Sequence, residues 1–533
     1  MAWVTAPSLM HRTGCLRLGD IKFTPIFGFD WKALGDTGVR LAEQGLLPEH
    51  ITRAIADNVL NPRMAVLILQ NEYDTERFNA RGREPNWVRK LDDVAKRHLR
   101  MTHALGEGTD ALGILLNVPF TGIGYVVEDG GLIEDLCREL GIWRLQWVRQ
   151  LGFLHDPVVR SVETNHVAQT FNHTRYEHSL NVMAFATLIA HNNRLTRWQM
   201  RNLRAAALCH DARTPAGGDT TKSVDPPAFN EETHFPELFQ FPGWTRLKKQ
   251  YRLSGGLMHS IVLNKGVLGQ ILDVADKIAY VARDAERFLG RFTEQVDMRL
   301  MFAEPRRAMP AFYNMVGDHI RANPFPCSLW DDVHVENGQV FFTNPDRLFN
   351  FLKLRAMMFK FLYYHPAARF LEHTLASVVT KYLYDTGKVT RDELLRMTDE
   401  NLERKIETVF GMELWHINTL QGFMHPCAEK FSTQEEAEAR EQEVLAQGGN
   451  WMTLVENFKN GSSGGTNMLI RTEDGSIKQF RHAYPERAKR IMDIFQSRYP
   501  AWLYSARVDD SWATPEFKKA LGAYRERRKK GKL

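Results

Sequence analysis

Three short stretches decide the expected fold of this chain: Arg175-Tyr-Glu-His178, the pair His210-Asp211, and Asp276-Lys-Ile-Ala-Tyr280-Val-Ala-Arg-Asp284. Apolar residues at helical spacing follow the first stretch and precede the second, and the acidic residues of the third recur at the same spacing. Three helices would thus present two histidines and two aspartates. Imidazoles and carboxylates without cysteine suit Mn, Mg, Fe, Ni or Co rather than structural zinc. We predict that one divalent metal ion is bound by His178, His210, Asp211 and Asp276.

The same motifs occur in the same order in the HD superfamily of metal-dependent phosphohydrolases, and this chain resembles that superfamily. Four further segments resemble its deoxynucleoside triphosphate triphosphohydrolase (dGTPase-like) branch. They are Trp143-Arg-Leu-Gln-Trp-Val-Arg-Gln-Leu-Gly152, His173-Thr-Arg-Tyr-Glu-His-Ser-Leu180, Arg355-Ala-Met-Met-Phe-Lys-Phe-Leu-Tyr-Tyr-His365 and Leu394-Leu-Arg-Met-Thr-Asp-Glu-Asn-Leu402. The resemblance implies a mainly α fold with an HD-domain helical core.

The resemblance also implies how a nucleotide would be held. It assigns the phosphate contacts to Arg175, Lys277 and Arg355, because a triphosphate is highly anionic and needs cations around it. It assigns the deoxyribose and its 3′-hydroxyl to four other side chains: Gln150, Leu151, Tyr363 and Asp284. Tyr280 and His365 are expected in the same substrate site. Surface charge is the alternative explanation for each cation, and core packing is the alternative for Leu151 and Tyr363.

The run that follows the His-Asp pair departs from the triphosphohydrolases. Where those enzymes carry histidines that assist catalysis, this chain has Thr214 and Asp219. The Gly218-Asp219 spacing instead resembles the HD 5′-deoxynucleotidases. We predict Asp219 as the first candidate for proton transfer or water orientation, followed by His234, with Glu232, Glu231 and Asp225 as further candidates. A role in capping the adjacent turn is the alternative for Asp219.

These patterns predict metal-dependent hydrolysis of a deoxynucleoside triphosphate to the deoxynucleoside and inorganic triphosphate. One alternative is a phosphatase for deoxynucleoside 5′-monophosphates, which the Asp219 spacing favours. Another is a nucleotide-binding regulatory module that keeps the metal without turnover, which the absent histidines favour. Members of the resembled family commonly form homo-oligomers, so self-association is expected by analogy.

Composition agrees with a large globular enzyme. The 533 residues are 44% hydrophobic and 25% charged, and the five cysteines include no CxxC pair. No apolar run has the length of a membrane span, and the first residues contain no signal-peptide core, so we expect a cytoplasmic protein without a membrane partner. The net charge of +5 and the basic run at 525–532 leave nucleic-acid binding open, although a solubilising tail is the favoured interpretation.

Composition divides the chain into residues 1–125, 126–410 and 411–533. The first part is predicted to add N-terminal helices of unassigned role to the central HD core. Proline, glycine and polar residues between 212 and 258 predict a loop or lid over the metal. In the last part, Ser432-Thr-Gln-Glu435 has the pattern of a capping box before an acidic helix, and residues 468–480 have the pattern of a small β-hairpin.

Overall fold

The computed structural model describes residues 16–18, 21–28, 114–118, 123–128, 131–153, 173–293, 329–359, 363–364, 366–414, 417, 423–457, 465–495, 501–509 and 511–529. The chain forms two compact units, Met1–Glu134 and Asp135–Leu533. Most of the described residues lie in helices, which confirms the predicted mainly α class. The division of the chain at residues 125 and 410 stays a prediction.

The first unit contains a four-stranded antiparallel sheet with the strand order β1-β2-β4-β3. Its strands are β1 (Leu16–Leu18), β2 (Ile21–Gly28), β3 (Ile114–Val118) and β4 (Ile123–Glu128). The sequence analysis did not predict them, because a short apolar run fits a buried helix as well as a strand. The helices expected within residues 1–125 lie outside the described residues.

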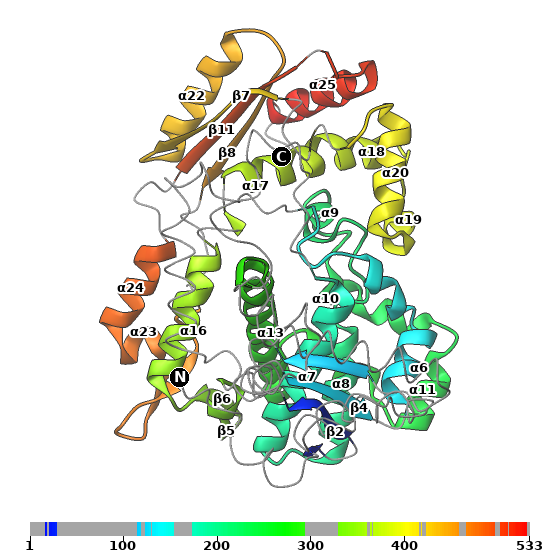
Figure 1. Ribbon diagram of the computed structural model, residues 1–533, viewed down its shortest axis with the longest axis vertical. Helices are drawn as coiled ribbons and strands as arrows, with labels where there is room; N and C mark the ends of the chain where they lie inside the picture. Colours follow the sequence, from blue (N-terminus) through cyan, green and yellow to red (C-terminus); the bar gives the residue numbers. More distant parts are fainter. Residues whose placement is uncertain are drawn as a thin grey trace, which may run out of the picture. The chain divides into compact units, whose positions relative to one another are not determined.

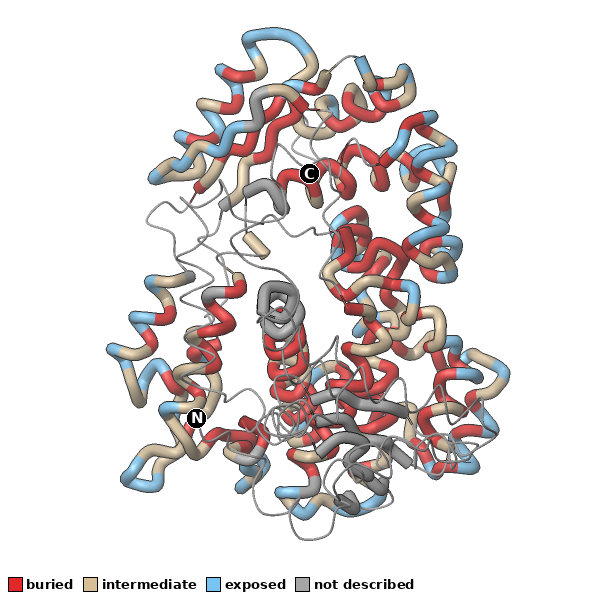
Figure 2. The backbone as a smooth tube through the Cα atoms, viewed as in Figure 1, coloured by how far each residue is buried: buried red, intermediate tan, exposed pale blue. Residues whose placement is uncertain are grey.

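Three helices of the second unit carry the motifs, namely α7 (Arg175–Asn192), α8 (Arg197–Cys209) and α13 (Gly266–Thr293). Helix α7 packs against both α8 and α13 (Figure 1). All three helices are buried over most of their described length (Figure 2), and Val182, Leu203 and Ile278 are fully buried representatives of their apolar sides. The helices predicted around the three motifs are therefore confirmed.

Short helices occupy the segment between α8 and α13. They are α9 (Gly218–Lys222), α10 (Glu231–His234), α11 (Trp244–Tyr251) and α12 (Gly255–Val262). The loop predicted for residues 212–258 is therefore wrong, because buried side chains such as Phe229, Phe235 and Leu247 anchor this segment in the core. Gly218 has a φ of 51°, and a Cβ there would lie 3.1 Å from the carbonyl oxygen of Arg149.

The buried carboxylate of Asp399 accepts hydrogen bonds from the turn before α9 and from a loop that is distant in sequence. Asp399, the first residue of α20 (Asp399–Phe410), is 2% exposed. Its carboxylate accepts hydrogen bonds from the backbone N–H groups of Gly217 and Arg149, both at 2.8 Å. Each carboxylate oxygen satisfies one donor that is shielded from water. Asp399 thereby fixes the start of α9 against the loop that carries Gln150.

The rest of the second unit packs around a hydrophobic core whose members, such as Leu402 and Tyr504, come from both sides of residue 410. The remaining helices of this unit are α16 (Pro345–Met358), α17 (Pro366–His373), α18 (Lys381–Asp385), α19 (Arg391–Arg396), α22 (Gln434–Ala446), α23 (Phe480–Ala483), α24 (Pro485–Phe495) and α25 (Pro515–Lys529). Helix α6 (Leu132–Glu139) crosses the boundary between the units. Among the helices that the structure describes, none combines the length and the apolar character that a membrane span requires.

The C-terminal region contains a three-stranded sheet that the sequence analysis missed. The strands β7 (Phe423–Phe431) and β8 (Trp451–Asn457) both pair antiparallel with β11 (Ala501–Val508), which lies between them. Because α22 connects β7 to β8, this is a split β-α-β arrangement. The capping box of α22 is made by Thr433 and Glu436, one residue later than predicted.

The predicted β-hairpin is confirmed by β9 (Leu469–Arg471) and β10 (Ile477–Gln479), which pair antiparallel. A second hairpin, β5 (Val333–Glu336) and β6 (Gln339–Phe342), joins it through a parallel contact between β6 and β9. The result is a four-stranded sheet of order β10-β9-β6-β5. No sequence pattern predicted that the two hairpins pair, because they lie far apart along the chain.

The beginning of the basic run is part of the fold. Arg525 donates to the carbonyl oxygen of Trp451 at 2.8 Å, and Arg528 pairs with the buried Glu441 at 2.7 Å. Arg527 donates to the carbonyl oxygen of Ser377 at 2.6 Å. These three arginines therefore hold α25 in place, which corrects the expectation of a solvated tail for this part of the run.

We expect Asp399→Ala to lower the free energy of unfolding by about 2–4 kcal/mol, because two buried N–H groups would lose their charged acceptor. Urea denaturation of the full chain, followed by circular dichroism, measures this change. The matched control is Asp392→Ala, whose side chain is 70% exposed and which should change stability by about 0.5 kcal/mol or less. Equal stabilities of the two variants would contradict the fastening role of Asp399.

Candidate metal centre

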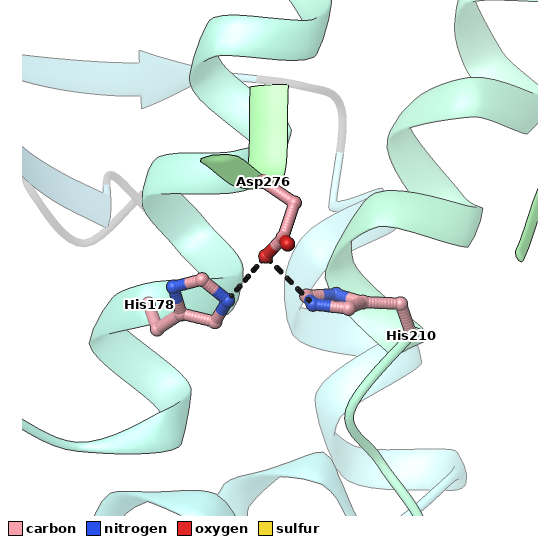
Figure 3. Close-up of side chains that lie close together, drawn as sticks. All are labelled: His178, His210 and Asp276. Carbon is pink, nitrogen blue, oxygen red and sulfur yellow. Dashed lines mark ion pairs between the residues drawn. The ribbon is translucent and has the colours of Figure 1, made fainter. Parts of the chain in front are cut away.

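Two histidines and an aspartate come together from α7, α8 and α13 (Figure 3). His178 lies in the first turn of α7, His210 directly follows α8, and Asp276 belongs to α13. The Nε2 atoms of His178 and His210 lie 2.9 and 3.8 Å from Asp276 Oδ1. Two ligands about 2.2 Å from one ion, at an angle of about 90–120°, are about 3.1–3.8 Å apart. The three donor atoms therefore have a spacing that can hold a metal ion.

Asp211 lies beside this cluster. Its Oδ2 is 3.8 Å from His178 Nε2 and 3.6 Å from His210 Nε2, and the same oxygen accepts a hydrogen bond from Arg175 at 2.8 Å. Burial alone would raise the pKa of Asp211, but the charge of Arg175 and the neighbouring histidines hold it well below its usual range. The carboxylate is thus ionised and able to coordinate a cation, although its role as a ligand stays a prediction.

A hydrogen bond orients one of the two imidazoles. His210 Nδ1 lies 2.7 Å from the carbonyl oxygen of Ala207. Because that oxygen is an acceptor, Nδ1 carries the proton and Nε2 keeps its lone pair for a ligand. A set of two imidazoles and two carboxylates fits Mn, Mg, Fe, Ni or Co, and the identity of the metal stays a prediction.

A cavity of about 240 Å³ opens beside the cluster. A water molecule takes about 30 Å³, so this cavity has room for an ion with its waters and for part of an anionic substrate. Of the predicted substrate and catalytic residues, Gln150, Arg175, Glu232 and Tyr280 belong to its wall. The further candidate Glu231 also lines it, together with three polar residues that the sequence analysis did not select, namely Lys222, Asn264 and Asp273.

The charges of the cavity wall favour a cation. Its carboxylates are those of Asp211, Glu231, Glu232, Asp273 and Asp276, whereas its permanent cations are Arg175 and Lys222. The excess of negative charge attracts a divalent ion and repels a free phosphate. A bound metal would offset part of this charge, so the electrostatics favour phosphate binding after metal binding.

Asp219 and His234, the two main candidates for proton transfer, both lie outside the cavity wall. Asp219 accepts from Arg175 at 2.7 Å and from Lys222 at 2.9 Å, and half of its side chain is exposed. Burial would raise the pKa of Asp219, but the charges of Arg175 and Lys222 lower it to about 2. His234 lies outside the cavity wall, with Nδ1 2.8 Å from Glu237 and Nε2 3.1 Å from the carbonyl oxygen of Pro227. Both ring nitrogens of His234 are therefore engaged elsewhere.

Several residues of the predicted nucleotide site do not line the cavity. Lys277 forms an ion pair with Asp273, and Leu151 is partly buried in the turn after Gln150. Arg355 is 7% exposed, and its Nε donates to the hydroxyl of Tyr280 at 2.6 Å. Arg355 thus lies one side chain behind the cavity wall. His365 lies outside the described residues.

The buried Asp284 and the partly buried Tyr363 form a hydrogen-bonded pair near the cluster. The Tyr363 hydroxyl donates to Asp284 Oδ2, and His173 Nδ1 lies 3.3 Å from Asp284 Oδ1. Burial raises the pKa of Asp284 to about 7, although the hydrogen bond from Tyr363 works in the other direction. The predicted contact of Asp284 with a 3′-hydroxyl stays a prediction, because this carboxyl is fully buried and is absent from the cavity wall.

Sequence reasoning did not select Lys222, and it gave no indication of the contact that holds Glu231. Lys222 follows Asp219 by three residues, which is the spacing of an ion pair on one helix face, but the segment was expected to be a loop. Glu231 accepts a hydrogen bond from Thr214, which is 17 residues away. Such a contact leaves no periodic signal in the sequence.

Comparisons with known proteins show a shared fold. No family model matches the chain, and no curated protein matches its sequence. Among solved structures, its fold is similar to that of a phosphohydrolase from Bacteroides thetaiotaomicron. The two have 16% sequence identity and a TM-score of 0.51 over 74% of this chain and 100% of the other. The match covers the whole length of the neighbouring structure, so the region that the two proteins share is the complete fold of that phosphohydrolase.

We expect His178→Ala and Asp276→Ala each to weaken Mn²⁺ binding by more than about a hundredfold, because each removes a ligand rather than a supporting contact. Isothermal titration calorimetry with metal-free protein measures the affinity. His482→Ala is the matched control, because His482 is exposed and remote in sequence from the three motifs. If both variants bind Mn²⁺ as the wild type does, the proposed centre is wrong.

We expect Asp284→Asn to change how stability depends on pH. A pKa raised to about 7 means that the folded chain holds this proton more tightly than the unfolded chain does. The stabilising contribution of the protonated carboxyl is complete below about pH 4 and is lost as the pH rises to about 7. Asparagine resembles the protonated form and does not ionise. The difference in melting temperature, variant minus wild type, should therefore increase between pH 5 and pH 8. A constant difference would contradict the raised pKa.

Proposed function

We propose that this protein is a metal-dependent phosphohydrolase that converts a deoxynucleoside triphosphate to the deoxynucleoside and triphosphate. The observation that carries the proposal is the convergence of His178, His210 and Asp276 beside a cavity that also presents Arg175 and Lys222. The fold shared with a phosphohydrolase supports the reaction class. The deoxynucleotide substrate rests on the resemblance of the motifs.

The chain's own residues have defined tasks in such a reaction. A divalent ion held by the histidines and aspartates would supply Lewis-acid chemistry to a phosphate ester. Arg175, fixed by Asp211 and Asp219, gives the site a buried positive charge that complements an anionic substrate. Asp219 is ionised at neutral pH, so it can accept a proton or orient a water but cannot donate a proton.

The sugar and the outer phosphates would meet the residues farther from the metal. Gln150 and Tyr280 line the cavity, and Tyr280 is held by Arg355. In this proposal Arg355 contacts a triphosphate once the Tyr280 hydroxyl moves aside, and the Asp284–Tyr363 pair lies against the sugar. Leu151 and Lys277 remain candidates for the same substrate. Glu232, which lines the cavity, is a second carboxylate beside the reacting phosphate.

A phosphatase for deoxynucleoside 5′-monophosphates is the second candidate. Two observations favour it: Asp219, whose spacing after the His-Asp pair resembles the HD 5′-deoxynucleotidases, is bonded to Arg175, and Lys277 is paired with Asp273. The positive charge of Arg175 therefore lies close to the metal site, and that of Lys277 is neutralised by Asp273. This distribution of charge suits a substrate with one phosphate. The two candidates differ in the product that they release.

The test is an assay of the purified full chain with Mn²⁺, Mg²⁺ or Co²⁺ against a panel of nucleotides, with products separated by chromatography. We expect a deoxynucleoside and inorganic triphosphate from a deoxynucleoside triphosphate. Asp219→Asn should lower kcat by about a hundredfold or more while metal binding persists. The exposed Asp392→Asn is the matched control and should keep its rate.

Release of orthophosphate from a monophosphate, with no cleavage of triphosphates, would select the second candidate. Arg355→Ala adds an independent check, because it should raise KM about tenfold to a hundredfold for a triphosphate and change little for a monophosphate. Nucleotide binding without any product, in the presence of bound metal, would instead select a regulatory module.

A further inference from the structure

Lys222 is a cavity-lining cation at the end of α9, and its ammonium is held by two carboxylates. Its Nζ lies 2.9 Å from Asp219 Oδ1 and 2.5 Å from Glu231 Oε1. The side chain is 23% exposed and contributes to the wall of the cavity beside the metal cluster. We propose that Lys222 contacts the phosphoryl group of the substrate next to the metal. This inference rests on the proposed phosphohydrolase function.

The hydrogen-bonding capacity of Lys222 supports this role. An ammonium has three donors. Asp219 and Glu231 take two of them, and within the described residues no third acceptor contacts Nζ. The third donor can therefore bind a phosphate oxygen without the loss of either existing contact. Lys222 keeps its positive charge. Burial and the charge of Arg175 lower its pKa, but Asp219 and Glu231 raise it, and the net shift is upward.

The other cation of the cavity wall is less accessible. Arg175 has an exposed fraction of 4%, and its two terminal nitrogens donate to Asp211 at 2.8 Å and to Asp219 at 2.7 Å. Its guanidinium is thus committed to carboxylates on both sides, and it acts through its charge. Lys277, which sequence reasoning placed on the phosphate, lies outside the cavity wall and is paired with Asp273. Lys222 is therefore better placed than either for direct contact with a phosphate.

A chain of contacts fixes where the Lys222 ammonium lies. The Thr214 hydroxyl donates to Glu231 Oε1, the same oxygen that binds Lys222. Glu231 is the first residue of α10, whose start is capped by Asn230 through a 2.8 Å bond from the N–H of Thr233. On the other side, Asp219 is fixed by Arg175. Thr214, Glu231 and Asp219 are thus positioning residues for Lys222.

The first experiment titrates orthophosphate into the full chain, with and without Mn²⁺, by isothermal titration calorimetry. We expect Lys222→Met to weaken phosphate binding in the Mn²⁺-loaded protein about tenfold to a hundredfold, because a charge-assisted hydrogen bond is lost. The same variant should raise KM for the nucleotide that the wild type cleaves. Lys249→Met is the matched control, because Lys249 is exposed on α11 and lies outside the cavity wall.

Loss of Lys222 leaves Asp219 and Glu231 without their shared cation, so Lys222→Met can fail to fold. Lys222→Gln then replaces it, because the amide still donates to both carboxylates but carries no charge. The effect on phosphate affinity should be the same. Wild-type affinity and KM in the variant that folds would overturn the proposal, and so would a wild-type protein that binds no phosphate.

The positioning chain has its own test. Thr214→Val removes the hydroxyl that holds Glu231 and should raise KM about tenfold or less, with little change in kcat. In a Glu231→Gln background, the same substitution should have a smaller effect, because the contact has already been weakened. A change in melting temperature without any change in KM would contradict the positioning role. If the wild type cleaves no nucleotide, the proposed function fails, whereas the phosphate titration still decides the role of Lys222.

Discussion

The buried guanidinium of Arg175 is the interaction on which the site depends. It joins Asp211, next to the two histidines, to Asp219, which in turn holds Lys222. Removal of one partner from such a buried ion pair costs about 3–5 kcal/mol, because the other charge remains without compensation. The candidate metal cluster and the side of the cavity that carries Lys222 are therefore one electrostatic unit rather than two separate sites.

This arrangement separates the acidic residues by their protonation. Asp211 and Asp219 are next to Arg175 and have lowered pKa values, so both stay ionised. Asp284 is buried beside a tyrosine and a histidine, and its pKa is raised to about 7. Burial opposes ionisation in all three cases, and the local cation decides the outcome. Carboxylates with different charge states within one region provide both cation binding and neutral hydrogen bonding.

The backbone that carries these side chains is held by contacts over long sequence distances. Asp399 binds the N–H groups of Gly217 and Arg149, and so fixes α9 relative to the loop with Gln150. The hydrophobic core runs from Phe153 to Tyr524 and includes the strand residues Met452 and Ala506. The C-terminal sheet is thus packed into the same core as the helices near the site. Its contribution to the site is mechanical support through that core.

The sequence by itself determined the three helices that carry the motifs and three residues of the candidate metal cluster, His178, His210 and Asp276. Apolar periodicity around His178 and His210, and the spacing of Asp276 and Tyr280, are local properties that survive without tertiary contacts. The hairpin β9–β10 followed from turn residues in the same way. Its pairing with β6, the sheet β7-β11-β8 and the pairing of β2 with β4 depended on partners far along the chain.

Only the tertiary structure decided which charged residues face the cavity. Lys222 and Lys277 each lie on a helix near the metal motifs, and the sequence favoured Lys277. The folded chain pairs Lys277 with Asp273 and brings Lys222 to the cavity wall, between Asp219 and Glu231. The direction of a side chain depends on how its helix packs. It also depends on partners that the folded chain brings close, as Thr214 is brought close to Glu231. Periodicity specifies a helix face, but only packing specifies what that face meets.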